Sequence, residues 1–343
     1  MREPSNMFAA MPSPRPLFWY ARVLAAVFTA IFATAPAMAK EPILNLPVDC
    51  ALGSECYIQH YVDTDPSHGG ADFTCGPLSY DGNIGTDFAL PTVIAMWRGI
   101  DVLSAAPGTV LAIRDGMEDF PQGTEGAPDV SDQSCGNGVV VDHGGGWSSQ
   151  YCHLMNGSVA VQSGQRVPKG GVLGQIGLSG RTDFPHLHFV LRHEGRIVDP
   201  FNPDAEITCG APAINGGTLW QKPMVYQPGG LLTIGVTDTT PTLEIVRAGT
   251  ADKPKLAVDA PAIILFTLLY GAQKDDVLRL WVAGPDGELF SDSVTIEETA
   301  TQIVRASGRK IDGAWRDGGY RAQVQFTRNG QVIGQMSKDF TVE

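Results

Sequence analysis

The chain has 343 residues, of which 43% are hydrophobic and 18% are charged, so it is long enough for two domains with substantial cores. Its formal net charge of -13 excludes nucleic acid and anionic membrane surfaces as main partners, because both repel an acidic protein. The 40 glycines and 24 prolines indicate many turns, which together with short β-type runs predict an all-β fold.

The N-terminus is typical of an export signal. Arg15 and Arg22 precede an apolar run from Val23 to Ala35, and small residues follow at Ala37 and Ala39. The run is shorter than the ~20 apolar residues that span a bilayer. We therefore expect residues 1–39 to be a cleaved signal peptide. The mature protein would then be exported, to the periplasm or the medium, and would hold no membrane anchor.

Residues 40–79 form a cysteine-rich, irregular lead-in. From residue 80 to about 205, short β-type runs separated by Pro-Gly and Asp-Gly turns predict antiparallel strands, with a helical turn at 92–99 and a polar rim loop at 118–134. Residues 206–228 have the composition of a linker. Residues 229–343 contain regular short strands and predict an immunoglobulin-like β-sandwich, which we interpret as a binding or spacer module.

All six cysteines follow the predicted cleavage site, which in an oxidising compartment predicts three disulfides. One pair follows from the pattern, because two β-type runs flank the turn at 143–147 and their hairpin brings Cys135 close to Cys152. Cys152 also precedes His153. Adjacent strand residues face opposite ways, which argues against a cysteine–histidine catalytic dyad.

A His-x-His strand stands out between Ser179 and Phe189. In a strand, His186 and His188 share one face while Leu187 points the other way into a core, so two imidazoles reach one point in space. The alternative for this motif alone is a surface strand with two solvated histidines.

Several motifs carry a family resemblance by their order and spacing over residues 80–200. They are Asn83-Ile-Gly-Thr-Asp87, Ala105-Ala-Pro-Gly-Thr-Val110, Val141-Asp-His-Gly-Gly-Gly-Trp147, Tyr151-Cys-His-Leu154, Gly164-Gln-Arg-Val-Pro-Lys-Gly170 and Pro185-His-Leu-His-Phe189. The stretch resembles the lysostaphin-type (LytM-like) zinc metallopeptidases, which cut peptide cross-links of bacterial cell walls. The resemblance implies an antiparallel, lysostaphin-like domain of duplicated-hybrid type and one Zn²⁺ ion.

Residue by residue, the resemblance makes Asp87 and His188 zinc ligands and gives His153 and His186 catalytic roles on water and substrate. Asn83 stands where the family has a ligand histidine, and an amide oxygen is a poorer donor to zinc. We expect Asn83 to lie on the same strand face as Asp87, with Gly85 leaving room for a weakly bound metal between them.

Four further histidines are considered as site residues. His68 and Asp72 also fit a His-x-Gly-x-Asp pattern, but the motif expected next follows Asp87, so His68 is either a solvated loop residue or a donor folded over from the lead-in. His143 and its neighbour Asp142 are interpreted as structural. His60 and His193 are given no role.

Two functions follow from the resemblance. The first is an exported zinc endopeptidase acting on peptidoglycan peptides, in which one of His153 and His186 accepts a proton and the other stabilises the oxyanion. The second is a non-catalytic relative that binds cell wall or activates a partner cell-wall hydrolase. Retention of Asp87 and the three histidines favours the enzyme, whereas Asn83 favours the second function. A serine hydrolase is not supported, because Ser179 lacks the Gly-x-Ser-x-Gly elbow.

Overall fold

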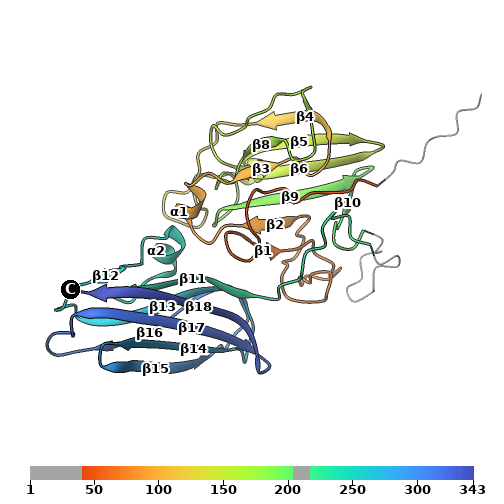
Figure 1. Cartoon of the computed structure of the whole chain (residues 1–343). Coiled ribbons are helices and arrows are strands. Elements are labelled where there is room, and N and C mark those ends of the chain that lie inside the picture. The colour runs from red at the N-terminus through yellow and green to blue at the C-terminus, as the bar shows by residue number, and fades with distance from the viewer. Residues whose placement is uncertain (1–40, 204–216) are drawn as a thin grey trace, which may run out of the picture. The chain divides into compact units, whose positions relative to one another are not determined.

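A computed structural model describes residues 41–203 and 217–343 (Figure 1). The predicted signal peptide, Cys209 and the first half of the predicted linker lie outside these residues. In the described part, antiparallel strands dominate, as the sequence predicted, and no helix there has the length and apolar character to cross a membrane.

Residues 41–203 are built mainly on one antiparallel sheet. Its strands run in the order β1 (Tyr57–His60), β2 (Thr86–Ala89), β9 (His186–His193), β6 (Trp147–Leu154), β5 (Asn137–Gly144), β4 (Gly108–Arg114) and β7 (Arg166–Val167), while β10 (Arg196–Val198) also pairs with β9. A separate ribbon pairs β3 (Asp101–Leu103) with β8 (Val172–Gln175). The sheet places the two ends of the motif set, on β2 and β9, next to each other.

Strand alternation divides the side chains of this sheet between a core and an open face. Phe88, Tyr151, Leu187 and Phe189 are all essentially inaccessible to solvent and join one apolar cluster. Residues at the alternate positions of β2 and β9 face the other way, which confirms that Leu187 points into a core.

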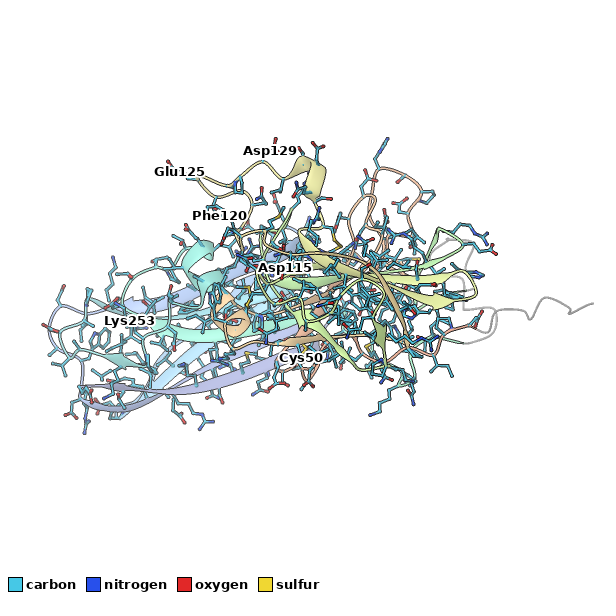
Figure 2. The ribbon with its side chains drawn as sticks, turned by 90° about the horizontal axis from the view of Figure 1, so that it is seen from above. Cys50, Asp115, Phe120, Glu125, Asp129 and Lys253 are labelled. Atoms are coloured by element: carbon cyan, nitrogen blue, oxygen red, sulfur yellow. A yellow bond between two sulfur atoms is a disulfide. The ribbon has the colours of Figure 1, made fainter. Side chains whose placement is uncertain are left out.

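Two connecting segments match their predictions. The expected helical turn is α1 (Val93–Met96), capped by the Thr92 hydroxyl, which accepts a hydrogen bond from the Ala95 backbone N–H. The polar loop at 118–134 ends in the short 3-10 helix η1 (Ser131–Gln133), and Figure 2 shows Glu125 and Asp129 on this loop. Its last residue, Ser134, lines the groove described below.

The lead-in is more ordered than its sequence indicated, because β1 pairs with β2 as the edge strand of the sheet. Four residues are too few to show an alternation, and their partner lies far along the chain. Asp72, which fits the same motif as Asp87, is buried and structural: its Oδ1 accepts hydrogen bonds from Thr74 and the Gly76 backbone N–H, and its Oδ2 accepts one from the Tyr226 hydroxyl.

Two disulfides are defined in residues 41–203. Cys135 is bonded to Cys152, which confirms the predicted pair. A second bond joins Cys50 to Cys56 in the lead-in, and Cys75 is disulfide-bonded as well. The described residues contain no free cysteine.

The C-terminal residues form a β-sandwich, as predicted. One sheet holds β11 (Gly230–Thr237), β13 (Ala262–Ala272) and β16 (Ala300–Lys310). The other holds β12 (Lys255–Leu256), β18 (Gln331–Val342), β17 (Gly318–Arg328), β14 (Val277–Gly284) and β15 (Gly287–Thr295), and a helix α2 (Leu243–Ala248) follows β11. Inward-facing residues of both sheets, among them Leu265, Leu280 and Val324, share one core.

Candidate metal centre

Three adjacent strands bring the predicted site residues together. β2 and β9 pair so that Asp87 lies opposite His188 and Ala89 lies opposite His186. On the other side of β9, β6 places Cys152 opposite His188, and His153 follows it. Asp87, His153, His186 and His188 all line one groove, as predicted.

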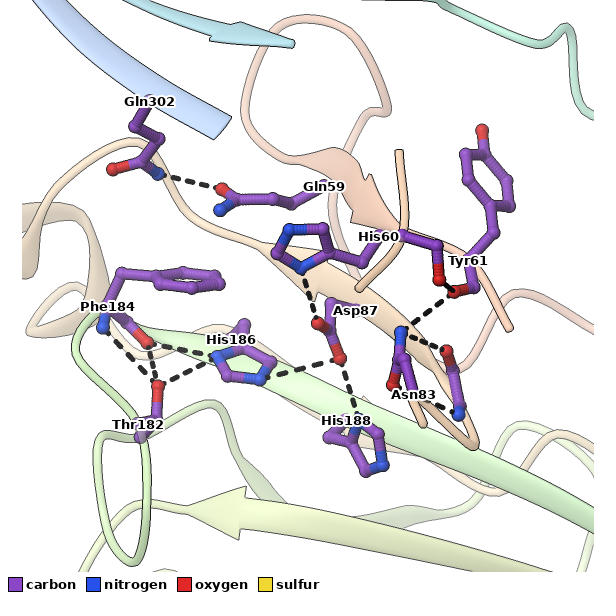
Figure 3. Close-up of polar contacts among 12 residues, drawn as sticks. Gln59, His60, Tyr61, Asn83, Asp87, Thr182, Phe184, His186, His188 and Gln302 are labelled. Carbon is purple, nitrogen blue, oxygen red and sulfur yellow. Dashed lines mark hydrogen bonds and ion pairs between the residues drawn. The ribbon is translucent and has the colours of Figure 1, made fainter. Parts of the chain in front are cut away.

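Asp87, His186 and His188 offer one ligand atom each to a common point (Figure 3). Oδ1 of Asp87 lies 2.7 Å from Nδ1 of His188 and 3.5 Å from Nε2 of His186, and the three ligand atoms all lie within 4.8 Å of one another. One carboxylate oxygen and two imidazole nitrogens form a donor set typical of zinc.

The charge at this point also suits a cation. Burial would raise the pKa of Asp87, but the nearby His186 and hydrogen bonds from His188 and His60 hold that pKa well below its usual range. Burial lowers the pKa of His186, so this imidazole is neutral at pH 7. Among the contacts of the described residues, Asp87 pairs with imidazoles and with no lysine or arginine. A buried carboxylate in such a setting fits a divalent metal ion.

The imidazole rings of His186 and His153 are oriented by hydrogen bonds on their outer nitrogens. Nδ1 of His186 lies 3.0 Å from the carbonyl oxygen of Phe184, and Nδ1 of His153 lies 2.8 Å from that of Ser179. A carbonyl only accepts, so both Nδ1 atoms carry the proton and both Nε2 atoms keep a free lone pair. For a metal-binding histidine, this outer hydrogen bond is the usual arrangement.

His153 departs from the strand alternation that the sequence predicted. Its backbone φ is 63°, a left-handed conformation uncommon for a residue other than glycine. As a result, Cys152 and His153 both line the groove instead of facing opposite ways. The cysteine–histidine dyad is nevertheless excluded, because Cys152 is held in a disulfide. Burial lowers the pKa of His153 well below its usual value, so its Nε2 is unprotonated at neutral pH.

Asn83 lies in the turn before β2 and not on the strand, contrary to our expectation. Its amide nitrogen donates hydrogen bonds to the carbonyl oxygens of Tyr61 and Gly85, at 2.8 and 3.0 Å, and its Oδ1 accepts a longer one from the Gly85 N–H. Asparagine commonly closes such turns with its own side chain. Both ends of this buried amide are therefore engaged with the backbone.

Gly85 was expected to leave room for a metal between residues 83 and 87. The space beside it is instead occupied by the imidazole ring of His188. A Cβ atom at this position would lie 2.7 Å from the carbonyl oxygen of Phe189 and 2.8 Å from Cε1 of His188. The absence of a side chain at Gly85 therefore lets His188 lie against β2.

Of the four remaining histidines, one contacts Asp87 and the other three do not. His60, to which the sequence analysis gave no role, contacts the site: its Nδ1 lies 2.9 Å from Oδ2 of Asp87. His68 is fully exposed beside Asp81 and takes no part in the cluster. His143 bonds the Pro107 carbonyl and the Ser149 hydroxyl, as its structural interpretation required, and the ring of His193 stacks on Trp147.

Residues 88–200 match peptidase family M23, so this part of the chain is a domain of the M23, or LytM-like, class. The match begins one residue after Asp87, and both Asn83 and Asp87 therefore lie outside it.

Named relatives fall into two groups. The chain is 30% identical over 128 residues to the peptidoglycan DD-endopeptidase ShyA of Vibrio cholerae, covering 37% of this chain and 24% of that protein. It is 36% identical over 108 residues to the murein hydrolase activator EnvC of Escherichia coli, covering 30% and 22%. The chain thus spans about a quarter of the length of these relatives.

Among solved structures, the catalytic domain of the antimicrobial peptidase lysostaphin from Staphylococcus simulans is similar at a TM-score of 0.27 and 19% identity, over 41% of this chain and 85% of that one.

Proposed function

We propose that this protein is a zinc-dependent endopeptidase that hydrolyses peptide cross-links of peptidoglycan. The observation that carries the proposal is the convergence of Asp87, His186 and His188, with His153 beside them, in one groove. An M23 domain and relatives named as peptidoglycan endopeptidases support the reaction class.

We assign the zinc to Asp87, His186 and His188. In a tetrahedral site with metal–ligand distances of about 2.0–2.1 Å, neighbouring ligand atoms lie about 3.3 Å apart, which is near the separation between Asp87 and His186. His186 thus takes the ligand place that the family resemblance gave to Asn83, whose amide is engaged with the backbone. Zinc held there would supply a Lewis acid that polarises the scissile carbonyl and activates water.

His153 is then the catalytic residue beside the metal. Its ring centroid lies 4.6 Å from that of His186, and its unprotonated Nε2 can accept a proton from water and return it to the leaving amine. Arg181 and Arg192 also line the groove, and they bring positive charge to an otherwise acidic protein. They suit the carboxylates of peptidoglycan peptides.

The test uses the zinc-loaded mature chain and purified peptidoglycan, with the released fragments identified by mass spectrometry. We expect wild type to release peptides cut at cross-links, His188→Ala to lose both zinc and hydrolysis, and His153→Ala to lose hydrolysis while keeping zinc. His68→Ala, at an exposed position, should behave as wild type. A zinc-loaded wild type that releases nothing would rule out the peptidase.

A second candidate is an activator of another cell-wall hydrolase. The specific observation in its favour is the engagement of Asn83 with the backbone, alongside similarity to the activator EnvC. If this function holds, the protein should stimulate a purified peptidoglycan amidase without cutting peptidoglycan itself. Stimulation should persist in His188→Ala, since it would not need the metal.

We also propose export to the periplasm or the medium. Disulfides persist in oxidising compartments, and the pairs Cys50–Cys56 and Cys135–Cys152 fit such a location.

A further inference from the structure

His60 belongs to the lead-in and lies outside the matched family domain, yet it contacts the central carboxylate of the site. Its Nδ1 lies 2.9 Å from Oδ2 of Asp87 (Figure 3), and both side chains are almost fully buried. His186 and His188 approach the other oxygen, Oδ1. The two oxygens of Asp87 therefore face different partners.

An irregularity in strand β1 brings His60 to this position. Ile58 pairs with Phe88, but the next pair is His60 with Asp87, so Gln59 is an extra residue in the ladder. Ile58 packs in the core, whereas both Gln59 and His60 line the groove. Simple alternation would turn His60 toward the core, and a β-bulge is the usual means of redirecting a side chain beside an active site.

Aromatic neighbours restrict the His60 ring. The Tyr80 ring packs against it in a T-shaped arrangement with centroids 5.1 Å apart, and the Phe184 ring centroid lies at 6.3 Å. A ring held in this way keeps its hydrogen bond without losing much rotamer freedom on binding.

The contact from His60 is also the one that metal binding leaves in place. A metal between Asp87 and His188 needs the lone pair of His188 Nδ1, so that nitrogen can no longer donate a proton to Asp87. The N–H of His60 points at Oδ2, away from the other ligands, and can remain. Ligating carboxylates are commonly fixed by such outer hydrogen bonds.

We propose that His60 is a positioning residue of the metal centre, which holds Oδ2 of Asp87 so that Oδ1 stays directed at His186 and His188. The lead-in would then be part of the site itself. This inference rests on the proposed zinc centre, but it concerns metal affinity and not the reaction.

The test measures zinc affinity of the mature chain by competition with a chromophoric chelator. His60→Ala should weaken zinc binding about 10- to 100-fold, the usual effect of losing an outer partner of a ligand. His60→Asn should recover most of the loss, because its amide N–H can reach the place of Nδ1. His68→Ala is the matched control on the same lead-in and should bind zinc as wild type does.

Circular dichroism of the metal-free proteins shows whether each variant folds. If His60→Ala does not fold, the comparison of His60→Asn with wild type still tests the inference. Wild-type affinity in folded His60→Ala would overturn the inference, and so would a His60→Asn as weak as His60→Ala, since the ring nitrogen would then bind metal directly. A wild type that binds no zinc would overturn it together with the metal centre. A wild type that binds zinc and cuts no peptidoglycan would refute only the peptidase.

Discussion

At the scale of single residues, Asp87 organises the site. It is buried, it is ionised at neutral pH, and its two oxygens are divided between His60 on one side and His186 and His188 on the other. Its neighbours supply hydrogen bonds but no permanent positive charge among the described contacts. Such a carboxylate is stable in a folded chain when a cation completes its surroundings.

Gly85 gives a prediction about the space beside Asp87. In Gly85→Ala, the new methyl group would press against the His188 ring and the Phe189 carbonyl, so His188 must move. We expect zinc affinity, measured by the same chelator competition, to fall at least 10-fold. Gly319→Ala, where a Cβ meets nothing within 4 Å, is the control. Unchanged zinc affinity in Gly85→Ala would show that His188 does not bind the metal.

Asp199 gives a prediction about stability and pH. Burial raises its pKa from 3.8 to about 7, while a hydrogen bond from the Phe201 N–H opposes the shift. The folded state therefore binds more protons than the unfolded state between these values, and stability should fall as pH rises from about 4 to 7. Asp199→Asn should remove this dependence and raise the free energy of unfolding at pH 8 by up to about 4 kcal/mol.

Urea unfolding at pH 5 and pH 8 measures the effect of Asp199→Asn. The gain over wild type should be larger at pH 8 than at pH 5, while Asp81→Asn, at an exposed position, should track wild type at both. A gain that is equal at the two pH values would contradict the role of Asp199.

At the scale of elements, strand parity was the most reliable guide from the sequence. It correctly placed His186 and His188 on one face and Leu187 in the core, because a regular strand leaves no other choice. It was wrong for the pair Cys152 and His153, which both line the groove because the backbone at His153 is left-handed. It was not applied to His60, whose side chain is redirected by a bulge. The bulge at Gln59 arises in the pairing of β1 with β2, and a local sequence pattern does not contain it.

The role of Asn83 was hidden for a related reason. Its spacing from Asp87 matched a ligand position, but its amide nitrogen donates to the carbonyl oxygens of Gly85, two residues away, and of Tyr61, 22 residues away. The sequence did show that residue 83 is an asparagine, a poorer zinc ligand than the histidine that the family has there. The contact between His60 of the lead-in and Asp87 could not be predicted from the sequence, because no local motif connects His60 to the site.

The hairpin of β5 and β6 gives a prediction about the disulfides. A disulfide stabilises by restricting the unfolded chain, and more so for longer loops. Cys135 and Cys152 are 17 residues apart and Cys50 and Cys56 only 6, so replacing the first pair by serines should reduce stability by about 1 kcal/mol more than replacing the second. Urea unfolding of the two double variants provides the comparison, and the reverse order would contradict it.

At the scale of the whole molecule, three parts of the chain have distinct relations to function. The M23 domain supplies three histidines of the site, the lead-in supplies His60, and Asp87 lies just before the matched residues. The C-terminal β-sandwich has its own core and adds no member to the Asp87, His186 and His188 cluster. Truncations designed only around the matched residues would therefore remove Asp87 and His60 together.

Zinc titration of the metal-free mature chain tests the central claim most directly, because it measures the metal centre independently of any substrate. We predict one equivalent of zinc bound by wild type and by His153→Ala, and none bound by Asp87→Ala or His188→Ala at the same concentration. Absence of stoichiometric binding in wild type, or full binding in Asp87→Ala, would contradict the account.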